Sequence, residues 1–208
     1  MPQLQGTLIG DRTPAVDRDA RVERVTLDSA SWVDVTRGWL RGADSLLDAL
    51  ILGVPWRQHR RRMYDRMVDD PRLSRWYDAD APFPHRALYE IRSALEERYR
   101  VAFGGVALNY YRDGRDSVAF HGDRELRDID DSRVAIVTTG AARSFLLRPH
   151  GGGPSRNLRP ASGDLLVMGG RTQADWEHGV PKVARAGPRV SISLRWSARD
   201  GAVVTRPR

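Results

Sequence analysis

Two histidines and one aspartate in the second half of the chain have the side chains and the spacing of a metal site. His121 and Asp123 lie two residues apart in SVAFHGD, so in an extended segment their side chains point the same way. A distant histidine could complete the set, and His178 in QADWEHGVPK is the best candidate because it comes just before a turn signal. Two imidazoles and a carboxylate can hold Fe(II) while leaving coordination positions open. Taken alone, the first two residues also fit a solvated surface pair, and we expect three histidines to be structural or solvated: His59, His85 and His150.

The segment RVSISLRW near the end of the chain would have one polar and one apolar face as a strand. Arg189 and Arg195 share the polar face with two serines, and the opposite face is wholly apolar. If the apolar face packs in the core, both arginines point into the opposite space, which in a small barrel is the interior. An arginine buried there is costly unless an anion meets it, and its planar guanidinium suits a carboxylate. The alternative is an exposed sheet face with two ordinary surface arginines.

The segment LNYY offers an amide and a phenol that share a face. Asn109 and Tyr111 alternate with Leu108 and Tyr110, so a strand would place the two polar groups on one side. By itself, this pattern also fits a strand with one buried tyrosine and a polar edge. The order along the chain favours a functional interpretation, because the amide and phenol are followed by the His and Asp pair, the distant histidine and the two arginines.

All of these residues lie in a half of the chain whose pattern predicts short β-strands. After Val101, apolar and β-branched runs are split by Gly, Pro, Asp and Asn, which is typical of an antiparallel sandwich or barrel. Before it, apolar residues recur every three or four positions at 43–52 and 85–99, which predicts two helices. The segment HGGGPSRNLRPASG predicts a long solvent loop between strands. The predicted strands are VALNYY, SVAFHGD, RVAIVTT, RSFLLRP, DLLVMGG and RVSISLRW.

Composition limits the chemistry and suggests a polyanionic partner. The 208-residue chain is long enough for one good core, and the lack of cysteine excludes disulfides, thiol nucleophiles and iron–sulfur ligation. A formal charge of +7 and a sequence pI of about 10.4 favour phosphate binding. Lys182 is the only lysine, however, and such an arginine excess can also reflect genome composition. Because neither a signal peptide nor a membrane-spanning run is apparent, we expect a cytoplasmic protein without membrane contact.

An arginine-rich segment in the first half mixes aromatic and cationic side chains. Such a mixture suits stacking on bases and contact with phosphates, and a base must leave the duplex stack to reach a buried metal. The alternative is an amphipathic helix with aromatic residues in the core and solvated arginines. The residues are Trp56, Tyr64, Trp76 and Tyr77, with Arg57, Arg60, Arg61, Arg62, Arg66, Arg72 and Arg75.

Several of these motifs together resemble the catalytic half of the AlkB-type dioxygenases, in that family's order and spacing. They are NYYRDGRDSVAFHGD, RSFLLRP, GDLLVMGGRTQADWEHGVPK and PRVSISLRW, and the match runs from about Val101 to Trp196. The resemblance implies a mainly β fold with flanking helices (α+β), built on a double-stranded β-helix or jelly-roll core. It also implies an N-terminal extension with helices and a nucleotide lid over 1–100 and the jelly-roll core over 101–208, together forming one compact domain.

The resemblance further implies an enzyme that uses Fe(II), 2-oxoglutarate and O2. The three candidate ligands described first would hold the iron. Arg189 would bind the far carboxylate of 2-oxoglutarate, assisted by Tyr111 and Asn109. Arg195 would lie near the metal-bound carboxylate of the cosubstrate and near Asp123.

For the substrate, the resemblance implies oxidative dealkylation of bases such as 1-methyladenine and 3-methylcytosine, with release of formaldehyde. PRLSRWY resembles the lid segment of the family, which places Trp76 and Tyr77 in the lid. Glu125 matches a position whose carboxylate accepts a hydrogen bond from an exocyclic amine of the damaged base. Arg124 and Ser191 depart from the residues common in relatives, which bears on base preference and on the finer cosubstrate contacts.

We expect DNA as the polymer and a monomer as the state of the protein. The alternatives are the same chemistry on RNA or protein, since fold and metal ligands alone do not set the substrate, and a noncatalytic basic nucleic-acid-binding module. Arg143 in RSFLLRP also matches a family position, where we expect structural support.

Overall fold

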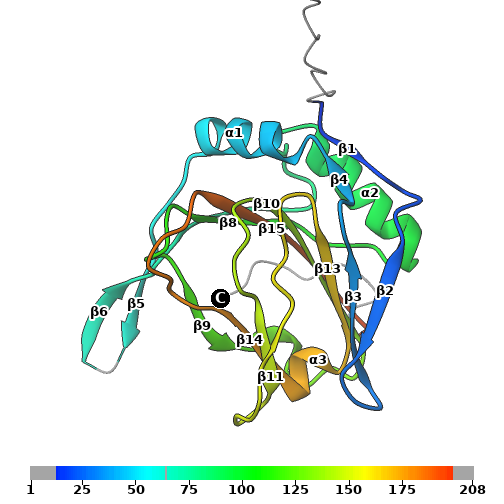
Figure 1. Ribbon diagram of the computed structural model, residues 1–208, viewed down its shortest axis with the longest axis vertical. Helices are drawn as coiled ribbons and strands as arrows, with labels where there is room; N and C mark the ends of the chain where they lie inside the picture. Colours follow the sequence, from blue (N-terminus) through cyan, green and yellow to red (C-terminus); the bar gives the residue numbers. More distant parts are fainter. Residues whose placement is uncertain (1–12, 64, 199–208) are drawn as a thin grey trace, which may run out of the picture.

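Two antiparallel β-sheets pack face to face in the computed structural model, which describes residues 13–63 and 65–198 but not the side chains of 61–63 and 66 (Figure 1). The mainly β architecture with flanking helices is confirmed. The larger sheet has seven strands, in the spatial order β2 (Val22–Thr26), β3 (Ser31–Thr36), β13 (Leu165–Gly170), β10 (Ser132–Gly140), β15 (Arg189–Ser197), β8 (Val106–Tyr111) and β7 (Leu73–Tyr77). The smaller sheet has four strands, in the order β12 (Arg156–Asn157), β11 (Leu146–Pro149), β14 (Trp176–Val180) and β9 (Val118–His121).

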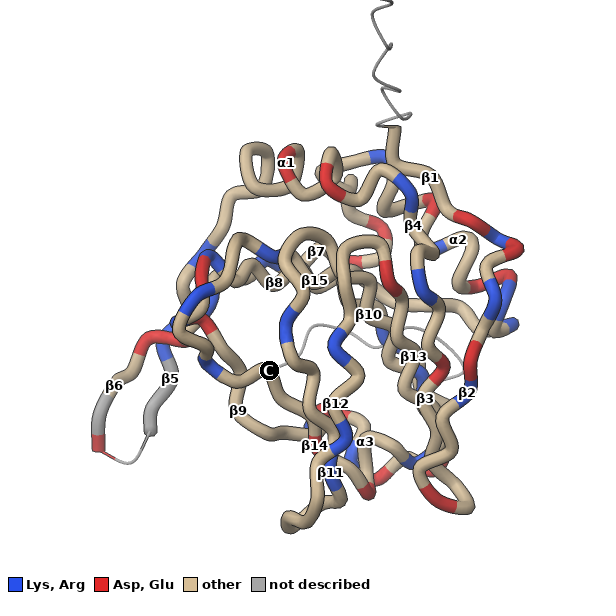
Figure 2. The backbone as a smooth tube through the Cα atoms, in the orientation of Figure 1, with Lys and Arg blue, Asp and Glu red and all other residues tan. Residues whose placement is uncertain are grey.

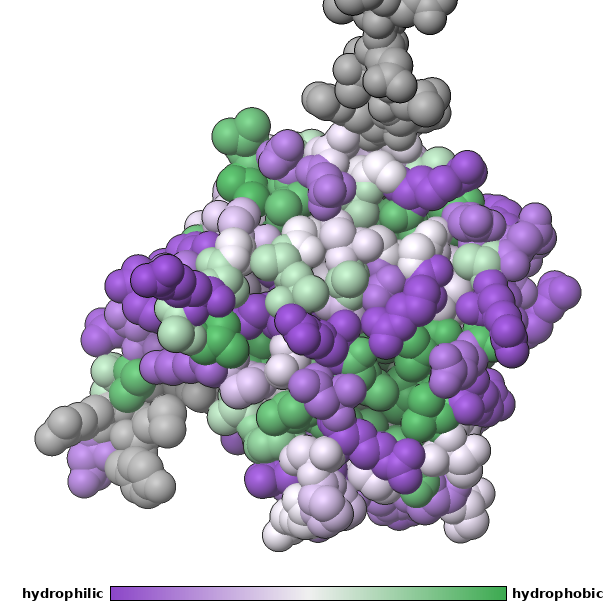
Figure 3. Space-filling view, in the orientation of Figure 1, coloured by the Kyte–Doolittle hydropathy of each residue, from purple (hydrophilic) through white to green (hydrophobic). Residues whose placement is uncertain are grey.

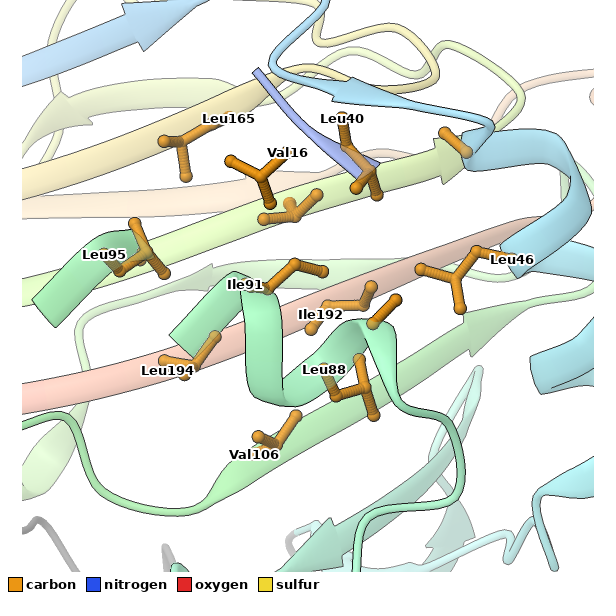
Figure 4. Packing of buried hydrophobic residues seen from close by; sticks show 14 of the residues in the cluster. Val16, Leu40, Leu46, Leu88, Ile91, Leu95, Val106, Leu165, Ile192 and Leu194 are labelled. Atoms are coloured by element: carbon orange, nitrogen blue, oxygen red, sulfur yellow. The ribbon is translucent and has the colours of Figure 1, made fainter. Parts of the chain in front are cut away.

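Two helices cover the outer face of the larger sheet, as the sequence pattern predicts. They are α1 (Ala43–Gly53) and α2 (Ala87–Tyr99), and α2 begins slightly after its predicted start. Figure 4 shows Leu46 of α1 and Leu88 of α2 packed over Ile192 of β15, all fully or almost fully buried. Each such side chain stabilises the fold by about 1.5–3 kcal/mol through removal of apolar surface from water.

This packing shows which way the polar and apolar faces of β15 point. Its apolar residues face the helices, so Arg189, Ser191 and Ser193 face the smaller sheet, and all three are buried. The alternative of an exposed polar sheet face is therefore wrong. Burial of both faces means that the polar face lines the space between the two sheets.

The space between the sheets has an apolar part and a polar part. On the side of β3, β13 and β10, valine, leucine and methionine side chains of the larger sheet pack against Phe145, Leu147 and Trp176. On the side of β15, β8 and β7, many of the inward residues are polar, among them Arg189, Ser191, Ser193 and Asn109. On the face shown in Figure 3, hydrophilic residues surround a hydrophobic area over β3 and β13. The space between the sheets thus has a polar part, which we call the chamber, beside a packed core.

Several strands were not anticipated. They include β12, which lies within the segment predicted as a solvent loop, and β14, which holds His178. Others come from the first hundred residues. β2, β3 and β7 all belong to the seven-stranded sheet, so this sheet takes strands from both sides of residue 100, and the boundary proposed there stays a prediction. Short pairs also form between β1 (Ala15–Val16) and β4 (Leu40–Arg41), and between β5 (Arg60–Met63) and β6 (Arg66–Asp69).

The arginine-rich segment folds as strands rather than as a helix, so the amphipathic-helix alternative is wrong. The hairpin of β5 and β6 projects from the body of the molecule (Figure 1). Tyr64 lies outside the described residues, as do the side chains of Arg61, Arg62 and Arg66. Among the described residues, every helix is too short or too polar to cross a membrane.

Candidate active site

Adjacent strands of the smaller sheet bring the three predicted metal ligands together. His121 ends β9 and His178 lies within β14, where the two residues are register partners. Asp123 follows in the turn before a short 3-10 helix, η1 (Arg124–Leu126). Ligand atoms of the three side chains all lie within 4.8 Å of one another, and the two imidazole centroids are 4.4 Å apart. This arrangement gives two nitrogen ligands and one carboxylate to a single ion.

Neighbouring groups orient both imidazoles. His121 donates from Nδ1 to the carbonyl of Ala119 at 2.9 Å, which leaves Nε2 as the lone-pair nitrogen. Such a hydrogen bond fixes the tautomer and ring direction of a metal-binding histidine. His178 stacks on the ring of Phe145 at 5.3 Å, and its Nδ1 is buried without a hydrogen-bond partner among the described residues.

Burial and charge keep Asp123 and His178 deprotonated. Burial raises the pKa of Asp123, but the guanidinium of Arg195 outweighs it and lowers this pKa to about 2. Arg195 Nε donates to Asp123 Oδ2 at 2.5 Å, so the predicted neighbourhood of these residues is present. Burial and the nearby His121 lower the pKa of His178 to about 3. A metal ion needs this protonation state of its ligands.

The second inward arginine has a buried, unsatisfied guanidinium. Arg189 is 1% exposed, and Nη2 donates to Thr138 Oγ1 at 3.2 Å. Its Nε and Nη1 have no hydrogen-bond partner, and it forms no ion pair, within 13–63 and 65–198. The ring of Tyr111, its register partner on β8, lies 5.1 Å away, and burial lowers the pKa of Arg189. A buried guanidinium with two open donors fits one end of a dicarboxylate such as 2-oxoglutarate.

Asn109 lies on the same inward face as Tyr111, because the two residues pair with Ser191 and Arg189 of β15. Its Oδ1 accepts a hydrogen bond from Arg72 Nε at 2.9 Å. We did not anticipate this contact, which joins positions 37 residues apart. Asn109, Tyr111 and Arg189 are brought to one chamber wall, while their contacts with 2-oxoglutarate stay predictions.

The two predicted lid residues lie on opposite faces of β7. Trp76 pairs with Ala107 and so shares the inward face of the sheet, whereas Tyr77 pairs with Val106 and packs against the core under the helices. Trp76 Nε1 donates to Asp78 Oδ1 at 2.7 Å. The structure therefore places only the tryptophan on the chamber side, and the substrate role of each residue stays a prediction.

Glu125 lies beside the metal ligands, in η1. Burial lowers the pKa of Arg195, but Asp123 and, to a smaller extent, Glu125 raise it above its ordinary value. Glu125 is half-buried, whereas the neighbouring Arg124 is exposed. Its position two residues after Asp123 is compatible with the predicted contact with a base, which stays a prediction.

Arg143 has the structural role that we expected. It is 2% exposed and donates to the carbonyls of Asp113 and Asp116 at 3.0 Å and of Pro181 at 2.7 Å. The first two belong to the loop before β9 and the third to the segment after β14. Arg143 therefore ties together the two strands that carry the imidazoles.

The comparisons with known proteins agree with this geometry. The family model of the 2OG-Fe(II) oxygenase superfamily matches residues 43–197. The chain belongs to the 2OG-Fe(II) oxygenase superfamily, and Fe(II), 2-oxoglutarate and O2 are the cofactors of that family. The donor set present here, two imidazoles and a carboxylate without cysteine, suits that iron.

Solved structures show the same fold. A prolyl hydroxylase from Trichoplax adhaerens, solved with a peptide of hypoxia inducible factor, has a TM-score of 0.62 at 12% identity, covering 81% of this chain and 84% of that one. A 2OG-Fe(II) oxygenase family oxidoreductase from Burkholderia pseudomallei has a TM-score of 0.54 at 17% identity, covering 76% and 80%. The predicted double-stranded β-helix is confirmed.

Within the superfamily, the sequence is similar to AlkB homologues. The mouse alpha-ketoglutarate-dependent dioxygenase alkB homolog 3 is 33% identical over 177 residues, which are 75% of this chain and 62% of that protein. The human DNA oxidative demethylase ALKBH2 is 35% identical over 102 residues, which are 45% of this chain and 39% of that protein. The predicted AlkB-type resemblance is confirmed, and the chain spans less than two thirds of the length of these relatives.

Proposed function

We propose that this protein removes alkyl groups from N-alkylated bases of DNA, of the 1-methyladenine and 3-methylcytosine type. The reaction couples decarboxylation of 2-oxoglutarate to hydroxylation of the alkyl group, and formaldehyde is released. One observation carries the proposal: Arg189, buried and without an acidic partner among the described residues, faces the same space between the sheets as the His121, Asp123 and His178 cluster.

The chain's own residues supply binding, orientation and exclusion of water. Bound Fe(II) and 2-oxoglutarate supply the oxygen-activating chemistry. His121, Asp123 and His178 would hold the iron and leave room on it for the cosubstrate and oxygen. Arg189 would bind a carboxylate of the cosubstrate, and the packed apolar half of the inter-sheet space would limit the access of water.

Three features favour a nucleic acid as the substrate. The formal charge of +7 attracts a polyanion. Figure 2 shows Lys and Arg positions on the side from which the hairpin of β5 and β6 projects, and Arg57 and Arg60 there are exposed. Trp76 offers an aromatic ring on the chamber side of β7, where a base outside its stack could be held. The name of the human relative, a DNA oxidative demethylase, supports DNA over other polymers.

Formaldehyde release tests the proposal. The protein is loaded with Fe(II) without oxygen, and then oxygen, 2-oxoglutarate and a single-stranded DNA oligonucleotide carrying 1-methyladenine are added. We expect formaldehyde and succinate in equal amounts and an unmethylated adenine in the product. The same oligonucleotide without the methyl group is the control and should release no formaldehyde.

Two other outcomes would change the proposed substrate or the proposed function. Faster release from a methylated RNA of the same sequence, or from a methylated peptide, would keep the chemistry and replace the polymer. Absence of iron uptake and of succinate, together with nucleic acid binding, would instead indicate a noncatalytic basic binding module.

A further inference from the structure

A buried glutamine contacts the backbone of the carboxylate ligand. Gln173 lies in α3 (Thr172–Asp175), the short helix directly before β14, and is 2% exposed. Its Oε1 accepts a hydrogen bond from the Asp123 backbone N–H at 3.0 Å, and its Nε2 lies 3.6 Å from Met168 Sδ. The first bond joins residues 50 positions apart and is buried at both ends. One side chain thus links the turn that carries Asp123 to the segment that leads to His178.

α3 is itself fixed to the larger sheet. Thr172 Oγ1 donates to the carbonyl of Gly169 at 2.6 Å and to that of Trp32 at 3.2 Å. Arg171, just before the helix, forms a bidentate ion pair with Asp175, with N···O distances of 2.8 and 3.0 Å. The backbone that carries the glutamine is therefore held to the larger sheet by Thr172 and stabilised within the helix by the Arg171–Asp175 pair, independently of the metal ligands.

A second, steric observation places the same turn against the same helix. A Cβ added to Gly122, between the two ligands, would lie 2.7 Å from the backbone carbonyl oxygen of Gln173. Real Cβ atoms do not approach an oxygen this closely, so any larger residue would push the turn away from α3. The contact is between backbones and does not depend on the glutamine side chain.

We propose that Gln173 is a positioning residue that fixes the direction of the Asp123 carboxylate toward the metal. His121 and His178 are already coupled as register partners, whereas Asp123 lies beyond the end of β9 and has no strand partner. Arg195 holds the carboxylate itself, and the hydrogen bond to Gln173 adds a separate hold on the backbone of Asp123. The inference rests on the metal site of the proposed function and not on the identity of the substrate.

The physical effect is preorganisation. Groups that orient metal ligands typically change metal affinity or activity 10- to 100-fold when they are removed. Replacement of Gln173 by methionine keeps the volume and flexibility of the side chain but leaves the buried N–H of Asp123 without an acceptor. We expect the turn to relax, so that the carboxylate stays paired with Arg195 but no longer keeps its direction toward the metal.

Titration with Co(II) tests the proposal without turnover. The purified full chain is titrated with Co(II) alone, and binding is followed by the visible absorption of the bound ion. We expect Gln173→Met to bind Co(II) about 10- to 100-fold more weakly than the wild type. Thr139→Val is the matched control, because it removes a buried hydrogen bond of 3.2 Å to the carbonyl of Val190, away from the metal. It should lose similar thermal stability and keep the wild-type affinity.

If Gln173→Met does not fold, a second pair of variants tests whether the position of the turn against α3 governs metal binding, and wild-type Co(II) affinity in Gly122→Ala would then overturn the proposal. Gly122→Ala should also weaken Co(II) binding, whereas Gly53→Ala, where an added Cβ meets nothing within 4 Å, should not. Wild-type affinity in Gln173→Met, or equal weakening in Thr139→Val, would overturn the proposal. If the wild type itself binds no Co(II), the assignment of the metal site is wrong. This outcome differs from one in which the wild type and Gln173→Met bind Co(II) equally well, which would contradict only the role of Gln173.

Discussion

Replacement of Arg189 by methionine should change cosubstrate binding and protein stability in opposite directions. The guanidinium is 1% exposed, makes one hydrogen bond of 3.2 Å to Thr138, and has two donors without partners. In the protein without ligand, Arg189 is therefore a desolvated charge that no acid of the described residues offsets. Methionine fills a similar volume without that charge, so the ligand-free variant should be more stable than the wild type.

The magnitudes follow from the burial of the charge. Truncation of one partner of a buried charge pair costs about 2–5 kcal/mol in affinity, so the Kd for 2-oxoglutarate should rise about 30- to 4000-fold. Replacement of a buried charged group by an apolar one of similar volume is neutral or stabilising by about 1–4 kcal/mol. For a chain of this length, each kcal/mol raises Tm by roughly 2–4 °C.

Arg143→Met is the matched control, because Arg143 is equally buried but donates to three backbone carbonyls. Its loss should destabilise the protein by about 3–5 kcal/mol. Both variants are measured by thermal unfolding without ligand, and 2-oxoglutarate affinity is measured by calorimetry with Co(II) in place of Fe(II). The reasoning would be refuted if Arg189→Met lowered Tm as much as Arg143→Met does, or bound 2-oxoglutarate as tightly as the wild type.

Three further predictions concern the metal ligands, the substrate and an ion pair. Alanine in place of any one of the three metal ligands should abolish formaldehyde release with little change in the circular dichroism spectrum, and retained release in all three variants would contradict the ligand assignment. Trp76→Ala should weaken binding of a single-stranded oligonucleotide by roughly 5- to 150-fold in fluorescence anisotropy, because a stacked base contributes about 1–3 kcal/mol. Unchanged affinity would count against a nucleic acid substrate. Burial raises the pKa of Asp116, but hydrogen bonds from Arg112 outweigh it and hold this pKa below its ordinary value near 4. The ionised Asp116 therefore stabilises the folded protein above about pH 4, and this stabilisation is lost as the pH falls through the folded pKa. The free energy of urea unfolding of Asp116→Asn should thus depend less on pH in this range than that of the wild type.

Local alternation in the sequence was enough to predict most of the strands that carry the site, but not β14, which holds His178. The segment VALNYY forms β8 at Val106–Tyr111, and RVSISLRW forms nearly all of β15. The pattern could not tell whether the polar face of β15 points to solvent or inward, because both arrangements satisfy a period of two. Packing of the two helices on the apolar face decides this, and such packing joins distant parts of the chain.

Contacts between distant segments explain what the sequence did not show. β2 and β3 precede the predicted helices and complete the larger sheet through pairing with β13. The hydrogen bonds of Arg72 with Asn109 and of Gln173 with Asp123 span 37 and 50 residues. Contacts between residues so far apart leave no periodic pattern in the local sequence. The order of the metal ligands along the chain was informative because one strand pairing, that of β9 with β14, is enough to join them.

The central claim is that the His121, Asp123 and His178 cluster and Arg189 bind Fe(II) and 2-oxoglutarate together in the space between the sheets. Its most direct test is the visible charge-transfer absorption that develops when a 2-oxo acid chelates Fe(II), recorded without oxygen. We predict that the wild type shows this band with one Fe(II) per chain, that His178→Ala does not show it, and that Arg189→Met needs much more 2-oxoglutarate to reach it. A wild-type protein without the band, or a His178→Ala variant that shows it unchanged, would contradict the account.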